Sequence, residues 1–329
     1  MAIQWYPGHM HKAQKEMKEL LPKIDLLIEV LDARIPYSSA NPAISSLRGN
    51  LPCIKVLSKA DLADPELTKL WQSYLESEKG VKTITTRTDE KSKMKLVLDL
   101  CKKMVPSKVG GVKVINAMIA GIPNVGKSTL INVLAQRVIA KTGNEPAVTK
   151  SQQKINLEGG ITLFDTPGIL WPKVENEHSS YRLAVTGAIK DTIVEYEDIG
   201  FYAADYLIKT YPVLLKNRFG LDNIPDTEIA FLEQAATRRG ALRSGGRVNL
   251  HKICEVLINE LRSGMLGLIT LEHPDMIQAE ELKIKQDLAK KDQDKQDRKQ
   301  RFKDGSLTPS KREQKQVSRE HKANKRRKR

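Results

Sequence analysis

The sequence contains little cysteine, few aromatic residues and no long apolar run. Its three cysteines, Cys53, Cys101 and Cys254, are far apart in the chain. Because a disulfide scaffold or a metal site needs more cysteines at closer spacing, we expect buried thiols in a reducing compartment. No stretch reaches the roughly 18 apolar residues of a membrane span, and MAIQWYPGHM lacks the regions of a signal peptide. These two observations therefore favour a soluble, cytoplasmic protein that does not span a membrane.

Acidic residues are outnumbered, and the excess positive charge is concentrated at one end of the chain. The 329 residues include 55 Lys plus Arg and 40 Asp plus Glu, a net charge of +15. Residues 283–329 hold 19 of the basic and 7 of the acidic residues, which gives them a net charge of +12. Such a segment suggests a polyanionic partner, either nucleic acid or an anionic membrane. Because apolar residues are scarce there, we expect it to be disordered.

Strand-like and helical patterns alternate along the first half of the chain. Apolar strand patterns at 24–31 and 53–58 are followed by a helical pattern at 65–79, a strand pattern at 81–86 and a helical pattern at 91–104. This alternation predicts a mostly parallel sheet with helices on both faces, an α/β fold. From about residue 179 to 271 helical periodicity dominates, which predicts a smaller all-α domain. The predicted domains are residues 1–175 for the α/β part, 176–282 for the helical part and 283–329 for the basic, disordered tail.

The segment GIPNVGKS, residues 121–128, matches G-x-x-x-x-G-K-S between a predicted strand and a predicted helix. In such a P-loop, backbone N–H groups surround phosphate oxygens and the helix N-terminus adds its positive dipole end. The lysine would reach the β- and γ-phosphates, and the serine hydroxyl would hold Mg²⁺. A plain glycine-rich turn would not require the strand and the helix. The residues predicted to bind the nucleotide here are Gly121, Asn124, Val125, Gly126, Lys127, Ser128 and Thr129.

Three further residues fit the metal ion and the γ-phosphate. Asp165, in FDTPG at the end of a predicted strand, would reach Mg²⁺ through water. Gly168 would offer its backbone N–H to the γ-phosphate. Thr149, in PAVTK between the two motifs, is the candidate switch residue that would close on Mg²⁺ and the γ-phosphate. Each signal is weak alone, since DTPG also suits an ordinary turn, and gains weight from the P-loop.

The base is predicted from SKAD at the end of the second strand pattern. The carboxylate of Asp61 can accept hydrogen bonds from N1 and the exocyclic amine of guanine, whereas adenine offers no such pair of donors. The stem of Lys59 would lie along the ring, and Ser58 would add a hydroxyl. Leaving these groups unpaired would reject the wrong base strongly. Guanine is therefore the predicted base, which disfavours an ATP-dependent kinase.

The motifs SKAD, GIPNVGKST and DTPG, together with WYPGHM and LDARIPYSSANP, resemble the circularly permuted GTPases of the YlqF type, the ribosome biogenesis GTPase A family. The resemblance covers residues 1–282, and its specific feature is the motif order, because ordinary GTPases place the guanine motif after DTPG. Ser58 departs from the usual Asn or Thr; a serine can still hydrogen-bond but reaches less far, so this departure concerns the affinity for guanine and not the choice of base. In the permuted order the segment after DTPG leads directly into the helical domain. Loss of the γ-phosphate would therefore act on that domain.

The resemblance implies a function on the ribosome. The chain is expected to be a GTP-hydrolysing, Mg²⁺-dependent switch, slow without its partner, that binds the large ribosomal subunit or its precursor and promotes a late assembly step. Such a switch is expected to be monomeric. The resemblance also suggests that Asn124 holds K⁺ near the phosphates, whereas a turn-favouring asparagine is the alternative. A GTP-gated protein or membrane-surface adaptor, with the basic tail on anionic lipid, stays open as a second function.

Contacts to rRNA are expected from the helical domain. The sequence TRRGALRSGGRVNLHK, residues 237–252, is basic and contains glycines, so its arginines can meet RNA phosphates. A solvated charged surface would have the same composition. The predicted RNA-binding residues are Arg238, Arg239, Arg243 and Arg247.

The residue that orients the attacking water has no clear place in the sequence. Many GTPases carry a glutamine just past DTPG, but here Ile169, Leu170 and Trp171 follow it, and none has a suitable side chain. His9 in WYPGHM is the candidate, because an imidazole can orient the water or accept its proton near neutral pH. Packing of the apolar residues around His9 is an equally good reason for that motif.

Overall fold

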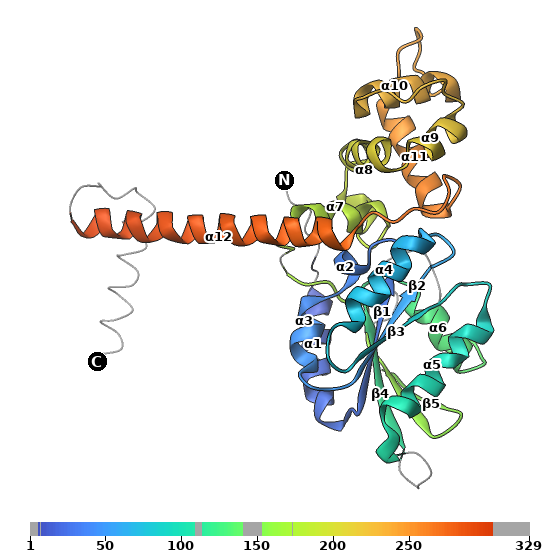
Figure 1. The fold of residues 1–329 in the computed structure, drawn as a ribbon, viewed down its shortest axis with the longest axis vertical. Helices are drawn as coiled ribbons and strands as arrows, with labels where there is room; N and C mark the ends of the chain where they lie inside the picture. The colour runs from blue at the N-terminus through green and yellow to red at the C-terminus, as the bar shows by residue number, and fades with distance from the viewer. Residues whose placement is uncertain (1–5, 7, 109–113, 141–152, 173, 305–329) are drawn as a thin grey trace. The chain divides into compact units, whose positions relative to one another are not determined.

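The computed structural model describes residue 6 and residues 8–108, 114–140, 153–172 and 174–304, except for the side chains of His9, Phe302 and Lys303. Residues 1–277 form one compact unit and residues 278–329 form another. Within the first unit, Figure 1 shows a twisted sheet with helices on both faces and a group of helices that follows it in the chain.

The sheet has six strands in the order β3-β2-β1-β4-β6-β5. Neighbouring strands are parallel except for β5 and β6, which form an antiparallel pair at one edge. β1 and β2 are buried along their whole length, as expected for strands covered on both faces. The strands are β1 (Leu26–Asp32), β2 (Cys53–Ser58), β3 (Val81–Thr85), β4 (Ile115–Gly121), β5 (Gln153–Leu157) and β6 (Ile161–Asp165).

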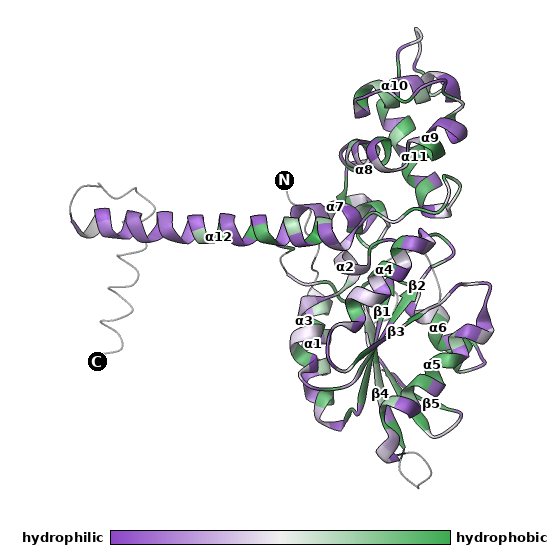
Figure 2. Cartoon of the chain, viewed as in Figure 1, coloured by the Kyte–Doolittle hydropathy of each residue, from purple (hydrophilic) through white to green (hydrophobic). Residues whose placement is uncertain are grey.

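Helices cover both faces of this sheet, with α1 and α3 on one side and α5 and α6 on the other (Figure 1). Helix starts follow local capping rules, since the Asn41 and Asp64 side chains accept backbone N–H groups at the beginning of α3 and α4. The central strands are strongly apolar, as Figure 2 shows. The elements are α1 (Gly8–Leu20), η1 (Leu21–Lys23), α2 (Pro36–Ser39), α3 (Pro42–Arg48), α4 (Pro65–Glu76), α5 (Lys91–Met104), η2 (Pro106–Lys108) and α6 (Lys127–Leu134).

The chain after the sheet is helical. Its helices pack closely, since a Cβ at Gly200 of α8 would lie 2.5 Å from the Cβ and Sγ atoms of Cys254 in α11. Only glycine allows this approach, which brings the two backbones together around a buried apolar core that includes Phe231 and Leu257. The elements are α7 (Glu177–Val185), η3 (Asp191–Ile193), α8 (Tyr196–Thr210), α9 (Pro212–Phe219), α10 (Glu228–Arg239) and α11 (Leu250–Ser263).

The second unit begins within α12 (Pro274–Lys303). Residues 285–301 of this helix are all exposed, and most of its length is hydrophilic in Figure 2. We expected residues 283–329 to be disordered, whereas residues 283–303 are helical. Lysine, glutamine and alanine favour a helix even where no apolar face can be buried, which explains the difference. Residues 305–329 lie outside the described part of the chain.

The expected α/β fold with a mostly parallel sheet is confirmed. The predicted ranges 53–58 and 91–104 coincide with β2 and α5, and the strand expected to end at Asp165 is β6. The boundary between the α/β and helical domains near residue 175 stays a prediction, because both parts belong to one compact unit. In the part of the chain that is described, no helix combines the length and the apolar character needed to span a bilayer.

Candidate nucleotide-binding site

The motifs selected from the sequence meet at one edge of the sheet. β1, β2, β4 and β6 are parallel, so their carboxyl ends lie together although they are far apart in the sequence. Asp32 at the end of β1 is opposite Ser58 at the end of β2, and Asp165 at the end of β6 is opposite Ile119 in β4. This edge is the position at which open α/β sheets bind ligands.

The P-loop connects β4 to α6 in the predicted strand-turn-helix context. Asn124 and Gly126 both have positive φ angles, of 59° and 89°, and Gly126 caps the N-terminus of α6 without a side-chain hydrogen bond. Lys127, Ser128 and Thr129 form the first turn of α6, so their backbone N–H groups have no partner within the helix. The loop therefore offers backbone donors and a helix dipole to an anion.

Lys127 and Asp165 form a buried ion pair between the P-loop and the DTPG motif. The lysine bonds to Oδ1 of the aspartate, and Oδ2 is buried without a hydrogen-bond partner among the described residues. Burial raises the pKa of the Asp165 carboxyl, although Lys127 acts in the opposite direction. A buried carboxylate oxygen without a donor suits a cation. The donor set of Asp165 and the Ser128 hydroxyl is all oxygen, which fits Mg²⁺.

The DTPG segment lies directly against the P-loop backbone. A Cβ at Gly168 would be only 3.1 Å from the Pro123 nitrogen, so no larger residue fits there without a shift. The Ile169 N–H donates to the Gly121 carbonyl at 3.2 Å, and the Thr166 hydroxyl donates to the Ile119 carbonyl at 2.8 Å. Gly168 is thus held beside the P-loop, as expected of a backbone donor to the terminal phosphate.

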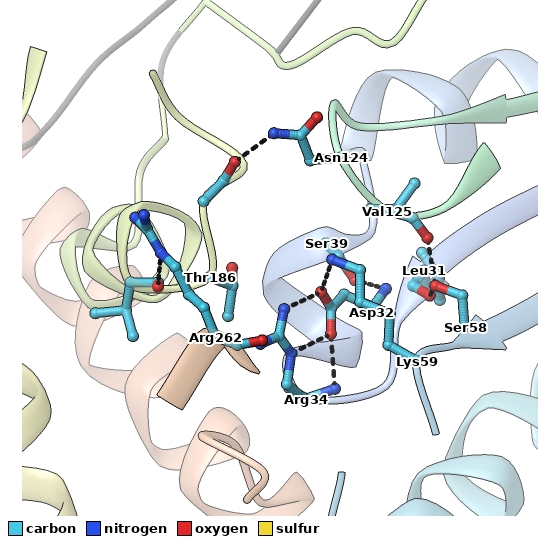
Figure 3. A network of polar contacts seen from close by, with 12 residues as sticks. Leu31, Asp32, Arg34, Ser39, Ser58, Lys59, Asn124, Val125, Thr186 and Arg262 are labelled. Carbon is cyan, nitrogen blue, oxygen red and sulfur yellow. Dashed lines mark hydrogen bonds and ion pairs between the residues drawn. The ribbon is translucent and has the colours of Figure 1, made fainter. Parts of the chain in front are cut away.

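The base loop, residues 58–64, follows β2. The Ser58 hydroxyl lies within hydrogen-bonding distance of the carbonyl groups of Leu31 and Val125, which links the SKAD motif to the P-loop (Figure 3). Asp61 Oδ1 is buried and has no hydrogen-bond partner in the described structure. A carboxylate oxygen in this state matches the paired donors of guanine.

Lys59 is held by a buried ionic cluster that the sequence analysis did not identify. Its backbone has a φ angle of 56°, and its ammonium group lies 2.9 Å from Asp32 Oδ2. Arg34 bonds to both oxygens of Asp32, at 3.0 and 2.8 Å. Burial alone would raise the pKa of Asp32, but Arg34 and Lys59 hold it well below its usual range. The motif LDARIP contains Asp32 and Arg34, but only the fold shows that these two residues face Lys59.

Residues of the helical part contact this edge of the sheet (Figure 3). The Asn124 side chain donates to the Gly187 carbonyl at 2.8 Å. Arg262, near the end of α11, donates to the carbonyl groups of Ala184 and Val185 at 2.8 Å, and its own carbonyl accepts from Arg34 at 3.5 Å. The P-loop, the β1 loop and the helical part are therefore joined by polar contacts.

Two of the predicted residues lie outside the described part of the structure. Thr149 belongs to residues 141–152, outside the described chain, and the His9 side chain is also outside it. The backbone of His9 is the second residue of α1. Its neighbour Met10 is fully buried, and the Met10 sulfur accepts the Leu170 N–H at 3.3 Å. The start of α1 is thus packed against the segment that follows DTPG.

The four arginines predicted to bind RNA are not equivalent. Arg239 bonds to Glu260 at 3.1 Å, and Arg238 pairs with Asp222 at 3.2 Å. Arg243 and Arg247 are exposed at the two ends of a tight turn, in which the Arg243 N–H donates to the Arg247 carbonyl at 2.7 Å. The two arginines of the turn are therefore placed side by side on the surface.

The fold and the site define a P-loop GTPase in which the base motif precedes the phosphate motifs. Residues 116–211 match the family described as 50S ribosome-binding GTPase.

The whole folded part has relatives. It is 44% identical over 282 residues to the ribosome biogenesis GTPase A of Bacillus pumilus, which covers 84% of this chain and 100% of that protein. The GNP-bound structure of YlqF from T. maritima is 27% identical, with a TM-score of 0.56 over 80% of this chain and 98% of that one. A GDP-bound YlqF structure gives 26% identity and a TM-score of 0.57 over 79% and 99%. The chain belongs to the ribosome biogenesis GTPase A family and is a GTP hydrolase involved in ribosome biogenesis.

Proposed function

We propose that the chain is a GTP-gated switch that binds the large ribosomal subunit or its precursor through rRNA and promotes a late step of its assembly. The observation that carries the nucleotide assignment is a pair of buried carboxylate oxygens that have no hydrogen-bond partner among the described residues, one on Asp61 and one on Asp165, at the same sheet edge as the P-loop. Asp61 would accept the donors of guanine. Asp165 would serve the metal ion that accompanies the phosphates.

The phosphate chemistry divides among a few residues. Lys127 would leave Asp165 to contact the β- and γ-phosphates, and the backbone N–H groups at the start of α6 would bind the remaining phosphate oxygens. Ser128 and Asp165 would hold Mg²⁺, directly and through water, with Thr149 closing the site in the GTP state. Mg²⁺ supplies charge neutralisation at the phosphates when it is bound. Gly168 would donate to the γ-phosphate. Loss of the γ-phosphate after hydrolysis would therefore release the segment that leads into α7.

A potassium ion is a further candidate cofactor. We propose that Asn124, a P-loop residue whose side-chain nitrogen donates to the Gly187 carbonyl, holds K⁺ near the phosphates with its side-chain oxygen. A K⁺ ion held by this oxygen would place positive charge beside the phosphates. Turnover that is faster in potassium than in sodium at equal ionic strength would support this assignment.

The ribosomal partner is supported by the family and by the basic turn. The matching family is described as a 50S ribosome-binding GTPase, and a relative from Xenopus tropicalis that is 33% identical is named mitochondrial ribosome-associated GTPase 1. Arg243 and Arg247 are exposed on a turn of the helical part, a suitable arrangement for RNA phosphates. A cytoplasmic, monomeric protein remains our expectation.

We expect purified large ribosomal subunits to raise the GTP turnover of the full chain severalfold. His9→Ala should lower the stimulated rate by about 10²-fold while GTP binding survives, because a residue that orients or deprotonates the water acts on the chemical step. Turnover should be measured with and without subunits, in potassium and in sodium. His11→Ala, an exposed histidine on the same helix, is the matched control.

Each outcome has a definite meaning. If anionic vesicles raise turnover and subunits do not, the chain acts as a membrane-surface adaptor and the ribosomal proposal is wrong. If subunits raise turnover equally in the native chain and in His9→Ala, another group orients the water.

Changing Arg243 and Arg247 together to glutamine is expected to weaken binding to large subunits in a salt-dependent way. Each lost phosphate contact should reduce the magnitude of the slope of log affinity against log salt by about 1. The slope for the double variant should therefore be smaller by about 2. Binding should be measured by cosedimentation across a salt series. Lys69→Gln with Lys95→Gln removes the same charge from exposed positions of α4 and α5 and should leave the slope unchanged.

A further inference from the structure

The base loop is held in place by a segment from the helical part. This return segment, residues 264–273, connects α11 to α12. Its Ile269 N–H donates to the Leu62 carbonyl at 3.0 Å, and its Leu271 N–H donates to the Arg34 carbonyl at 2.8 Å. Trp71 donates to the carbonyl of Glu272 at 3.1 Å. The loop that carries Asp61 is therefore supported by β2 on one side and by the return segment on the other.

Four polar residues connect the return segment to the base loop. The Asp64 N–H donates to the Thr270 hydroxyl at 3.1 Å. The Thr270 N–H donates to the Tyr211 hydroxyl at 3.2 Å, and that hydroxyl lies 3.3 Å from Asp64 Oδ2 and 3.2 Å from the Thr270 carbonyl. The Tyr206 hydroxyl donates to the same carbonyl at 3.0 Å. Asp64, Tyr206, Tyr211 and Thr270 thus form one cluster, the tyrosine cluster.

This cluster is partly buried and fixes the end of the base loop. Thr270 is fully buried, and burial raises the pKa of Tyr206 to about 12, so its hydroxyl keeps its proton near neutral pH. Asp64 is also the N-cap of α4, where it accepts two backbone N–H groups. Because Asp64 is only three residues beyond Asp61, a shift of this anchor moves the carboxylate that faces the base.

We propose that Tyr211 and Thr270 are positioning residues for guanine recognition, supplied to the base loop by the helical part of the chain. The proposal rests on the proposed function of Asp61 as the acceptor for guanine. Tyr211 acts on the side chain of Asp64 and Thr270 on its backbone, so the two together fix both the position and the orientation of the loop. Hydrogen bonds to a planar base lose strength quickly when the angle or the distance changes.

The arrangement has a consequence for regulation. The affinity for guanine and the position of the helical part are linked through the return segment, and such linkage is reciprocal. A partner that shifts the helical part would change nucleotide release as well as hydrolysis. This coupling between the nucleotide and the helical part is separate from the coupling through Gly168 and α7, because it depends on recognition of the base and not on the γ-phosphate.

The test compares guanosine diphosphate with inosine diphosphate, which lacks the exocyclic amine. In the native chain Asp61 favours the guanine nucleotide. Tyr211→Phe and Thr270→Val are each expected to lower the ratio of the two affinities by about 3- to 10-fold, the effect of one weakened hydrogen bond. The ratio should be obtained from equilibrium titrations of the full chain. Thr270→Ser keeps the hydroxyl and should restore the native ratio.

The control is Tyr196→Phe, which removes the hydroxyl that bonds to Asp191 at 3.1 Å within the helical part and should leave the ratio unchanged. A general loss of stability would lower both affinities and not their ratio. Native ratios in both Tyr211→Phe and Thr270→Val would overturn the positioning role. If Asp61→Asn itself fails to change base preference, the guanine assignment fails instead, so the two failures are distinguishable.

Discussion

Asp61→Asn is expected to lower the affinity for GTP by about 10²- to 10⁴-fold and to create binding of xanthosine triphosphate. Among the described residues Oδ1 of Asp61 is buried without a hydrogen-bond partner, and the two oxygens of a carboxylate can accept from the two adjacent donors of guanine. An asparagine can accept from only one of them and presents its amide nitrogen to the other. Xanthine carries a carbonyl in place of the exocyclic amine, which gives that nitrogen an acceptor.

The affinities for GTP and xanthosine triphosphate should be measured by titration, and turnover should be measured with both. Asp222→Asn, a change of the same kind on a highly exposed side chain of the helical part, is the matched control. Unchanged GTP affinity in Asp61→Asn would remove the guanine assignment. Loss of GTP binding without any gain for xanthosine triphosphate would show that Asp61 supports the loop and does not face the base.

Much of this site could be predicted from the sequence because its motifs are local. GIPNVGKS and DTPG each specify a short turn after a strand, and a parallel sheet brings such turns to one edge. The ends of β2 and of α5 followed directly from the apolar pattern and the turn residues around them. The sequence therefore predicts Lys127, Asp165 and Asp61 in one site.

The parts of the site that the sequence does not predict depend on contacts between distant residues. Arg34 and Lys59 meet at Asp32 only because β1 and β2 are adjacent and parallel. Tyr211 and Thr270 meet Asp64 only because the chain returns from the helical part. No local pattern marks such residues, since a tyrosine near the start of a helix and a threonine in a loop are both ordinary. The sequence pattern does not predict the helix at 283–303, because this segment has no apolar face. Its high helix propensity is the only signal for it.

Lys127→Ala is expected to reduce GTP turnover by about 10²- to 10³-fold, the usual effect of removing one charged group aimed at the transferring phosphate. In the described structure the lysine pairs with Asp165, so the same substitution also leaves a buried carboxyl without its counter-charge. Turnover should be measured at saturating GTP. Lys209→Ala, which removes an exposed lysine paired with Asp205 on α8, should keep the native rate.

The same variant should show a changed dependence of stability on pH. Burial already raises the pKa of Asp165 in the folded chain, and loss of Lys127 should raise it further. A carboxyl with a higher pKa in the folded state binds its proton more tightly there than in the unfolded state. The free energy of unfolding therefore falls as the pH rises from about 4, the unfolded value, to the folded pKa.

Thermal unfolding without nucleotide, measured from pH 4 to 8, should accordingly show a steeper loss of stability with rising pH in Lys127→Ala than in the native chain. The double variant Lys127→Ala with Asp165→Asn should lose this added slope, because asparagine does not titrate. Parallel pH profiles for the native chain and Lys127→Ala would mean that Asp165 is solvated in the nucleotide-free protein. In that case the lysine would be free to meet the phosphates without first breaking a buried ion pair.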